Sequence, residues 1–327
     1  MSLPDWPRAH GEMLFAANIR ERVEDFDVTE ELGFDFSGDG EHDYLYLQKT
    51  GTNTEWLARQ LAGFAKVPAK DIGYSGLKDR HAVTRQWFSV PRWNTPEWAD
   101  FAVEGVSILQ RERHAKKLRR GAHKANLFSI VLRGEGLQQH TAALEARVAT
   151  IQAEGVPNYF GEQRFGRDGA NLALADQWAE GRRLPRHKRS LAISTVRSFV
   201  FNESLHGRVR DGSWNQILPG DLANLDGSNS VFTVPEVDAD IQRRLVEMDI
   251  HPAAELSGDG SSCGNDTWQK ALDKGRVKTG SRSLRLPVRN LHVDTEDKSV
   301  RLSFRLGRGA YATSVLREIA NISNAAR

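Results

Sequence analysis

The sequence contains a single cysteine, Cys263, among its 327 residues. One cysteine excludes an internal disulfide framework and a metal cluster built on cysteine ligands. Long apolar runs are also missing: the longest, such as Leu127–Leu132, extend over only a few residues, so we expect no segment that spans a membrane. The first residues lack the apolar segment of a secretory signal peptide, and we therefore expect a cytoplasmic protein.

Several common catalytic motifs are absent as well. The sequence has no GxxxxGKS or GxxxxGKT motif, which excludes a P-loop nucleotide hydrolase, and it has no HExxH, GxSxG or CxxC motif. The ten histidines are scattered along the chain and form no pattern typical of a metal site. We therefore expect neither a metal ion nor an organic cofactor.

The composition is that of a folded protein with an uneven distribution of charge. The length predicts about two domains, and 39% hydrophobic and 27% charged residues are typical of a globular chain. The net charge is only +2, yet Arg111–Lys124 has a net charge of +6 and Arg182–Arg189 contains five basic residues and no acidic one. Two such runs in a nearly neutral chain favour binding to a polyanion over a merely solvated surface.

The residue patterns predict a mixture of strands and helices without regular alternation, which favours an α+β fold. Strands are expected over 41–47, 83–90 and 126–133. A helix is expected after Thr52, with Thr52 as its N-cap and Glu55 completing a capping box, and a second over 139–154. A closing helix is expected over Tyr311–Asn321.

The segment GYSGLKDRHAVTRQ, which begins at Gly73, is the strongest candidate for catalysis. Two glycines free the backbone for a tight loop, and Asp79 lies between two cations that favour its ionised form. Such an aspartate is suited to act as a nucleophile or a general base. Spacing alone favours an exposed charged turn, because Lys-Asp and Asp-Arg pairs are common in turns.

This segment resembles the signature of the TruD family of tRNA pseudouridine synthases. In this sequence, Ser75 occupies the position where the family usually has alanine. Other segments resemble the same family in the same order: Glu24–Glu30, Gly40–Thr54, Lys117–Arg133, Val156–Gly169, Leu284–Asn290 and Arg305–Glu318. The resemblance implies an α+β protein with a circularly permuted pseudouridine synthase catalytic domain, which contains a mixed sheet, and an inserted α/β TRUD domain. We expect the catalytic domain over residues 1–151 and 286–327, and the inserted domain over 152–285.

The resemblance also implies an activity and a set of site residues. The expected reaction is the isomerisation of uridine 13 of tRNA to pseudouridine, with Asp79 as the nucleophile acting on a flipped-out uridine in a basic cleft. Phe26, Asn126, Phe128 and Tyr311 are expected to contact the base. The residues expected to bind RNA phosphates are Arg20, Lys78, Lys116, Lys117, Arg119, Arg120 and Lys124.

Two alternatives remain open from the sequence. One is a non-catalytic RNA-binding or chaperone protein on the same fold. The other is a glycosidase that uses Asp79 with a second acid such as Glu162, in which case the basic runs would have no purpose. We expect tRNA as the partner of a monomeric protein that does not bind membranes. The sequence does not identify the basic residue that pairs with Asp79. If Lys78 and Arg80 lie in an extended segment, they point away from Asp79, and its partner then comes from a distant part of the chain.

Overall fold

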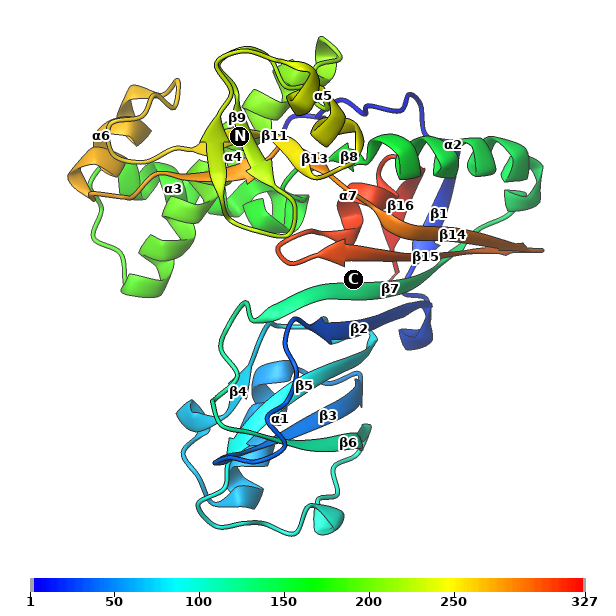
Figure 1. Cartoon of the computed structure of the whole chain (residues 1–327), viewed down its shortest axis with the longest axis vertical. Coiled ribbons are helices and arrows are strands. Elements are labelled where there is room, and N and C mark those ends of the chain that lie inside the picture. The colour runs from blue at the N-terminus through cyan, green and yellow to red at the C-terminus, as the bar shows by residue number, and fades with distance from the viewer. Residues whose placement is uncertain (1–2, 326–327) are drawn as a thin grey trace. The chain divides into compact units, whose positions relative to one another are not determined.

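The computed structural model describes residues 3–325, which form two compact units (Figure 1). Unit 1 comprises residues 3–13, Ala149–Val288 and Ala310–Ile319. Unit 2 comprises Leu14–Val148, Arg289–Gly309 and residues 320–325. The chain therefore passes between the two units several times.

Unit 2 is organised around a mixed ten-stranded sheet. Its main path runs in the order β14-β15-β7-β2-β5-β3-β6, and β1, β16 and β4 pair beside this path. The β2–β5 and β1–β16 pairs are parallel, and the other pairs are antiparallel. The strands are β1 (Phe15–Ile19), β2 (Phe26–Leu32), β3 (His42–Thr50), β4 (Gly73–Tyr74), β5 (Val83–Pro91), β6 (Val106–His114), β7 (His123–Arg133), β14 (Arg289–Glu296), β15 (Ser299–Gly307) and β16 (Ala320–Asn324).

Helix α1 (Thr54–Ala65) packs on this sheet through Leu57 and Leu61, which are fully buried with Leu45 and Phe88. Its N-cap differs from the expected one. The side chain of Asn53, not that of Thr52, accepts hydrogen bonds from the first backbone N–H groups of the helix. The expected capping box is therefore wrong, because the asparagine one position later reaches two free N–H groups at once.

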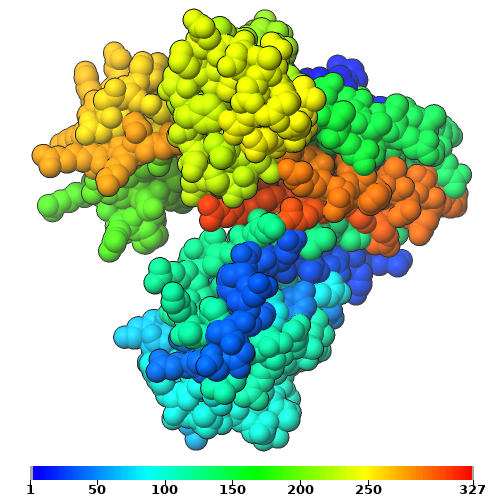
Figure 2. Space-filling view, in the orientation of Figure 1, coloured from blue at the N-terminus to red at the C-terminus, as the bar shows by residue number. Residues whose placement is uncertain are grey.

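Residues 33–41, which follow β2, have irregular structure and lie on the surface of unit 2, where they are blue in Figure 2. Phe34 and Phe36 hold it in place by packing on Tyr44 and Trp87. Leu118, from the loop between β6 and β7, is buried in the same cluster. This cluster anchors the basic loop to the sheet.

Unit 1 combines helices with small sheets. Its helices are α3 (Ala170–Ala179), α4 (Arg186–Arg210), α5 (Ala239–Val246), α6 (Asp266–Lys274) and α7 (Ala312–Leu316), and α2 (Thr141–Glu154) enters it from unit 2. Its strands are β8 (Val156–Pro157), β9 (Leu222–Leu225), β10 (Val231–Thr233), β11 (Ile250–Leu256), β12 (Gly280–Ser283) and β13 (Arg285–Leu286). The four-stranded sheet has the order β10-β9-β11-β12, and β13 pairs with β8.

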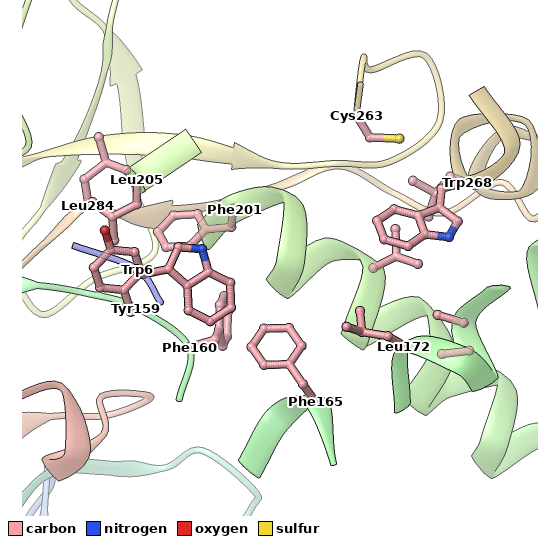
Figure 3. Close-up of a cluster of buried hydrophobic side chains, with 14 of the residues drawn as sticks. Trp6, Tyr159, Phe160, Phe165, Leu172, Phe201, Leu205, Cys263, Trp268 and Leu284 are labelled. Atoms are coloured by element: carbon pink, nitrogen blue, oxygen red, sulfur yellow. The ribbon is translucent and has the colours of Figure 1, made fainter. Parts of the chain in front are cut away.

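The core of unit 1 is aromatic. Trp6, Tyr159, Phe165 and Phe201 are buried together near one end of the cluster, and Trp268 lies toward the other (Figure 3). Trp6 also donates a hydrogen bond from its indole nitrogen to Glu203, so its one polar atom is satisfied. A residue near the start of the chain thus packs with segments more than 150 positions away.

The α+β class and the mixed sheet predicted from the sequence are confirmed. The end of the chain is a correction. The expected helix over Tyr311–Asn321 ends at Leu316, and Ala320–Asn324 forms β16 beside β1. The spacing of Val315, Leu316 and Ile319 predicts a helix locally, but pairing with a strand from the other end of the chain overrides it.

Candidate functional site

Asp79 lies in the loop between β4 and β5 of unit 2. Its side chain is 46% exposed, and one carboxylate oxygen is 3.1 Å from the Nη2 atom of Arg20. The neighbouring cations make other contacts: Lys78 pairs with Glu30, and the Nε of Arg80 donates to the carbonyl of Gly51. The partner of Asp79 therefore comes from a distant segment.

Arg20 has an unusual conformation directly after β1. Its backbone φ is 59°, which lies in the left-handed region that non-glycine residues rarely adopt. Its guanidinium stacks on the ring of Phe26, with Cζ 4.0 Å from the ring centroid. Such strain persists only where the surroundings enforce it, and it concentrates at functional sites. Arg20, predicted as a phosphate ligand, is thus engaged by Asp79 on one side and Phe26 on the other.

Two of the aromatic residues expected to contact a base, Phe26 and Phe128, lie on one face of the sheet. Phe128 on β7 is directly opposite Val28 on β2 and Phe304 on β15, so their side chains share that face. Phe128 stacks on Phe304 with ring centroids 5.3 Å apart and meets Phe26 edge to face at 6.3 Å. Of these two rings, Phe26 is buried and Phe128 is partly exposed.

Asn126 lies on the same face of β7, opposite Glu30 of β2. Its Oδ1 atom is buried, and it has no hydrogen-bond partner among the described residues. A buried acceptor without a partner costs free energy and is uncommon in folded proteins. The arrangement leaves Asn126 able to accept a hydrogen bond from a ligand.

A buried ion pair lies beneath the Asp79 loop. The Nζ of Lys78 is 2.7 Å from Glu30 Oε2, and the two side chains are 6% and 0% exposed. Ser75 donates a hydrogen bond of 2.6 Å to the same carboxylate oxygen. Lys78, also predicted as a phosphate ligand, therefore directs its ammonium into the protein, where it pairs with Glu30 instead of a phosphate.

The basic loop between β6 and β7 is attached to the Asp79 loop through its backbone. Gly121 N donates to Ser75 O at 2.7 Å, and Leu118 N donates to Ser89 Oγ at 2.9 Å. The approach is so close at Gly73 that a Cβ there would lie 2.5 Å from Leu118 O, which requires glycine. The five predicted phosphate ligands of this loop and the start of β7 are all exposed: Lys116, Lys117, Arg119, Arg120 and Lys124.

These five residues are not equivalent. Arg120 stacks on Tyr74 with Cζ 3.7 Å from the ring centroid and donates a hydrogen bond to its hydroxyl. Lys117 donates to the carbonyl of Lys70. Arg120 is thus the most firmly positioned cation of the group.

Tyr311 belongs to unit 1, at the N-cap of α7. Its hydroxyl accepts a hydrogen bond of 2.6 Å from Arg164, whose other guanidinium nitrogen donates to Ser194. Arg282 lies over the neighbouring ring of Phe160, with Cζ 4.2 Å from its centroid. Burial is the main cause that lowers the pKa of Arg282, to about 10.

Residues 3–325 contain neither a cluster of metal ligands nor a membrane-spanning helix. No group of three or more histidine, cysteine, aspartate or glutamate side chains in this range could hold a metal ion. No helix in the same range has the length and apolar character needed to cross a membrane.

Three residues that contact predicted site residues are not predicted from the sequence: Lys49 and Glu30, which contact the Asp79 loop, and Arg164, which contacts Tyr311. Glu30 and Arg164 lie within two of the segments that carry the family resemblance, Glu24–Glu30 and Val156–Gly169. Lys49 gives no local signal, because a lysine near the end of a strand ordinarily reaches solvent.

Comparison with known proteins places this site in a family. The fold matches a crystal structure of a candidate tRNA pseudouridine synthase D (TruD) from Methanosarcina mazei, with a TM-score of 0.72 and 19% identity over 99% of this chain and 96% of that one. This shows that the two proteins share a fold.

The sequence is more specific. A family model described as tRNA pseudouridine synthase D (TruD) matches residues 12–177 and 266–319. The chain is 45% identical to the tRNA pseudouridine synthase D of Methylococcus capsulatus, over 96% of this chain and 94% of that protein. It is 40% identical to the protein of the same name from Idiomarina loihiensis, over 100% and 98% of the two chains. The chain belongs to the TruD family.

Proposed function

We propose that the protein is a tRNA pseudouridine synthase that converts uridine 13 of tRNA to pseudouridine, with Asp79 as its nucleophile. The observation that carries the proposal is the Arg20–Asp79 ion pair beside Phe26, in a chain that belongs to the TruD family. Relatives named tRNA pseudouridine synthase D, which match nearly the full length of this chain, support the activity on tRNA.

The reaction fits the groups that are present. Isomerisation breaks the N-glycosidic bond of uridine and rejoins the same base through carbon, without net oxidation or hydrolysis. An exposed carboxylate can attack the nucleotide only if it is correctly oriented, and an arginine at 3.1 Å restricts its orientation. Asp79 is therefore the group that we expect to touch the reacting nucleotide.

The uridine must leave its stack to reach Asp79, which costs a few kcal/mol. Stacking on an aromatic side chain returns about 1–3 kcal/mol per base. We assign this role to Phe128 and Tyr311, and a supporting role to Phe26, whose ring holds Arg20. The unpartnered Oδ1 of Asn126 is suited to accept a hydrogen bond from N3–H of uracil.

The remaining assignments follow from charge and chain organisation. Lys116, Lys117, Arg119, Arg120 and Lys124 would bind phosphates near the target nucleotide, which positions RNA without reading its sequence. We assign residues 1–151 and 286–327 to the catalytic domain and 152–285 to the inserted TRUD domain. We further propose that the protein acts as a monomer in the cytoplasm.

The test is site-specific mapping of pseudouridine. An unmodified tRNA transcript with uridine at position 13 is incubated with the wild-type protein or with Asp79→Asn, without added metal or cofactor. Carbodiimide adducts and primer-extension stops then locate pseudouridine. We expect a stop at position 13 with the wild-type protein only.

Two other results would overturn parts of the proposal. A stop with both proteins would remove Asp79 from the role of nucleophile. No stop with either protein, together with tight binding of tRNA, would favour a non-catalytic RNA-binding protein.

A further inference from the structure

Lys49, near the end of β3, has a fully buried side chain with an exposed fraction of 0%. Its Nζ donates hydrogen bonds to two backbone carbonyls, Thr52 O at 2.6 Å and Asp79 O at 3.1 Å. Burial, partly offset by the nearby carboxylate of Asp79, lowers its pKa to about 8. A buried ammonium that bonds to carbonyls rather than to a carboxylate is costly for folding.

The second carbonyl that Lys49 binds is that of Asp79, so the costly burial of this ammonium acts on the loop that bears the proposed nucleophile. Three side-chain contacts hold the backbone of the Asp79 loop: Gln86 Nε2 donates to Gly76 O, Lys78 N donates to Thr54 Oγ1, and Lys49 Nζ donates to Asp79 O. Thr54 and Gln86 are themselves hydrogen-bonded at 3.0 Å. Of the three contacts, only that of Lys49 acts on the residue that bears the proposed nucleophile.

We propose that Lys49 is a positioning residue for Asp79, whose ammonium fixes the Asp79 backbone so that the carboxylate meets Arg20 in a single orientation. This inference rests on the proposed function. Two contacts then position the aspartate: Lys49 binds its main-chain carbonyl, and Arg20 pairs with its side chain. Misplacement of a reacting group by about 1 Å costs about a hundredfold in rate.

A purely structural role for Lys49 predicts something different. Lys49→Met removes the desolvation cost of a buried ammonium, and this gain offsets the loss of its hydrogen bonds to the two carbonyls. If Lys49 serves the position of Asp79, then Lys49→Met should lower the rate while it preserves or raises the stability. If Lys49 serves the fold alone, stability and the amount of active protein should fall together.

The experiment compares the wild-type protein, Lys49→Met and Lys298→Met on a tRNA transcript with uridine at position 13. Lys298 is a matched control because it is in the same unit and its side chain is 67% exposed, in an ion pair with Glu135. Pseudouridine formation gives kcat and KM, thermal unfolding gives Tm, and stoichiometric tRNA binding counts the folded molecules.

For Lys49→Met we expect kcat per folded molecule to fall by about tenfold to a hundredfold, with KM changed by less than about twofold and Tm unchanged or higher. Lys298→Met should match the wild-type protein in all three. A kcat per folded molecule of Lys49→Met within about twofold of wild type would overturn the inference. So would a rise in KM without a fall in kcat.

The wild-type sample separates this inference from the function on which it rests. If the wild-type protein forms no pseudouridine, the proposed function fails. If the wild-type protein is active and Lys49→Met is equally active, the function stands and only the role of Lys49 fails.

Discussion

The guanidinium of Arg20 lies between the carboxylate of Asp79, at 3.1 Å, and the ring of Phe26, at 4.0 Å. Arg20 belongs to the segment after β1 and Asp79 to the loop before β5, so two separate parts of the chain must fold correctly before the pair can form. The orientation of the proposed nucleophile therefore depends on the correct folding of both segments.

Replacement of Arg20 tests this link. We expect Arg20→Met to lower kcat by about tenfold to a hundredfold, because the carboxylate loses the charge that orients it. Arg20→Lys should retain most of the activity, since it keeps the charge. Single-turnover formation of pseudouridine measures both, with Arg301→Met, an exposed arginine on β15, as the control. Equal activity of Arg20→Met and wild type would show that Asp79 needs no partner.

The Lys78–Glu30 pair predicts an effect on stability. Both side chains are almost fully buried, so Lys78→Met leaves an unpaired carboxylate inside the protein. We expect the free energy of unfolding to fall by about 3–5 kcal/mol. The double variant Lys78→Met with Glu30→Gln should lose less than the sum of the two single variants, as measured by urea denaturation. Additive losses would mean that the two groups do not interact.

The basic loop predicts a change in affinity. Charge reversal at Lys116, Lys117 and Arg119 should raise the Kd for tRNA and reduce the slope of log K against log salt by about one per lost phosphate contact. Arg120 is left intact because it packs on Tyr74. Titrations at several salt concentrations measure the slope, and Lys298→Glu, a single charge reversal outside this loop, is the control. An unchanged slope would place the phosphate contacts elsewhere.

The lowered pKa of Lys49 predicts a dependence of stability on pH. The pKa is about 8 in the folded protein against the usual 10.5, so the unfolded chain binds more protons than the folded one between these values. The free energy of unfolding should therefore rise with pH across this window, relative to Lys49→Met, by up to about 3 kcal/mol. Below pH 8 the penalty is present in full. Urea denaturation from pH 7 to 10 measures it, and parallel curves would contradict it.

Tyr311 offers a test in unit 1. Tyr311→Phe keeps the ring and removes the hydroxyl that accepts from Arg164, whereas Tyr311→Ala removes both. If the ring stacks on a base, Tyr311→Ala should lose about 5- to 150-fold in kcat/KM, and Tyr311→Phe should lose much less. Equal losses would assign the role to the hydroxyl.

The parts of this structure that the sequence predicts are those set by local pattern. The β-branched and aromatic residues over 83–90 predict β5, and the apolar spacing of Leu57 and Leu61 predicts the buried face of α1. The strand β16 was mistaken for a helix because its partner, β1, is about 300 residues away. Contacts at that separation leave no trace in local periodicity.

The site divides in the same way. Asp79 is recognisable from its motif, but its partner Arg20 is set by the fold, because the two residues are almost 60 positions apart. From the sequence, Lys49 and Lys78 resemble ordinary exposed lysines of a strand and a turn. Only the packing of β2, β3 and the Asp79 loop shows that both ammonium groups are buried. The burial of a long polar side chain depends on its surroundings in three dimensions.

The parallel pairing of β1 with β16 has a consequence for biosynthesis. Phe15 pairs with Ala320, so β1 can pair with β16 only after about 305 further residues have been translated. At a translation rate of about 20 residues per second that delay is at least about 15 s. During this time the backbone groups on the β16 side of β1 are unpaired. A nascent polypeptide that stalls before Ala320 would leave this strand edge able to pair with other chains.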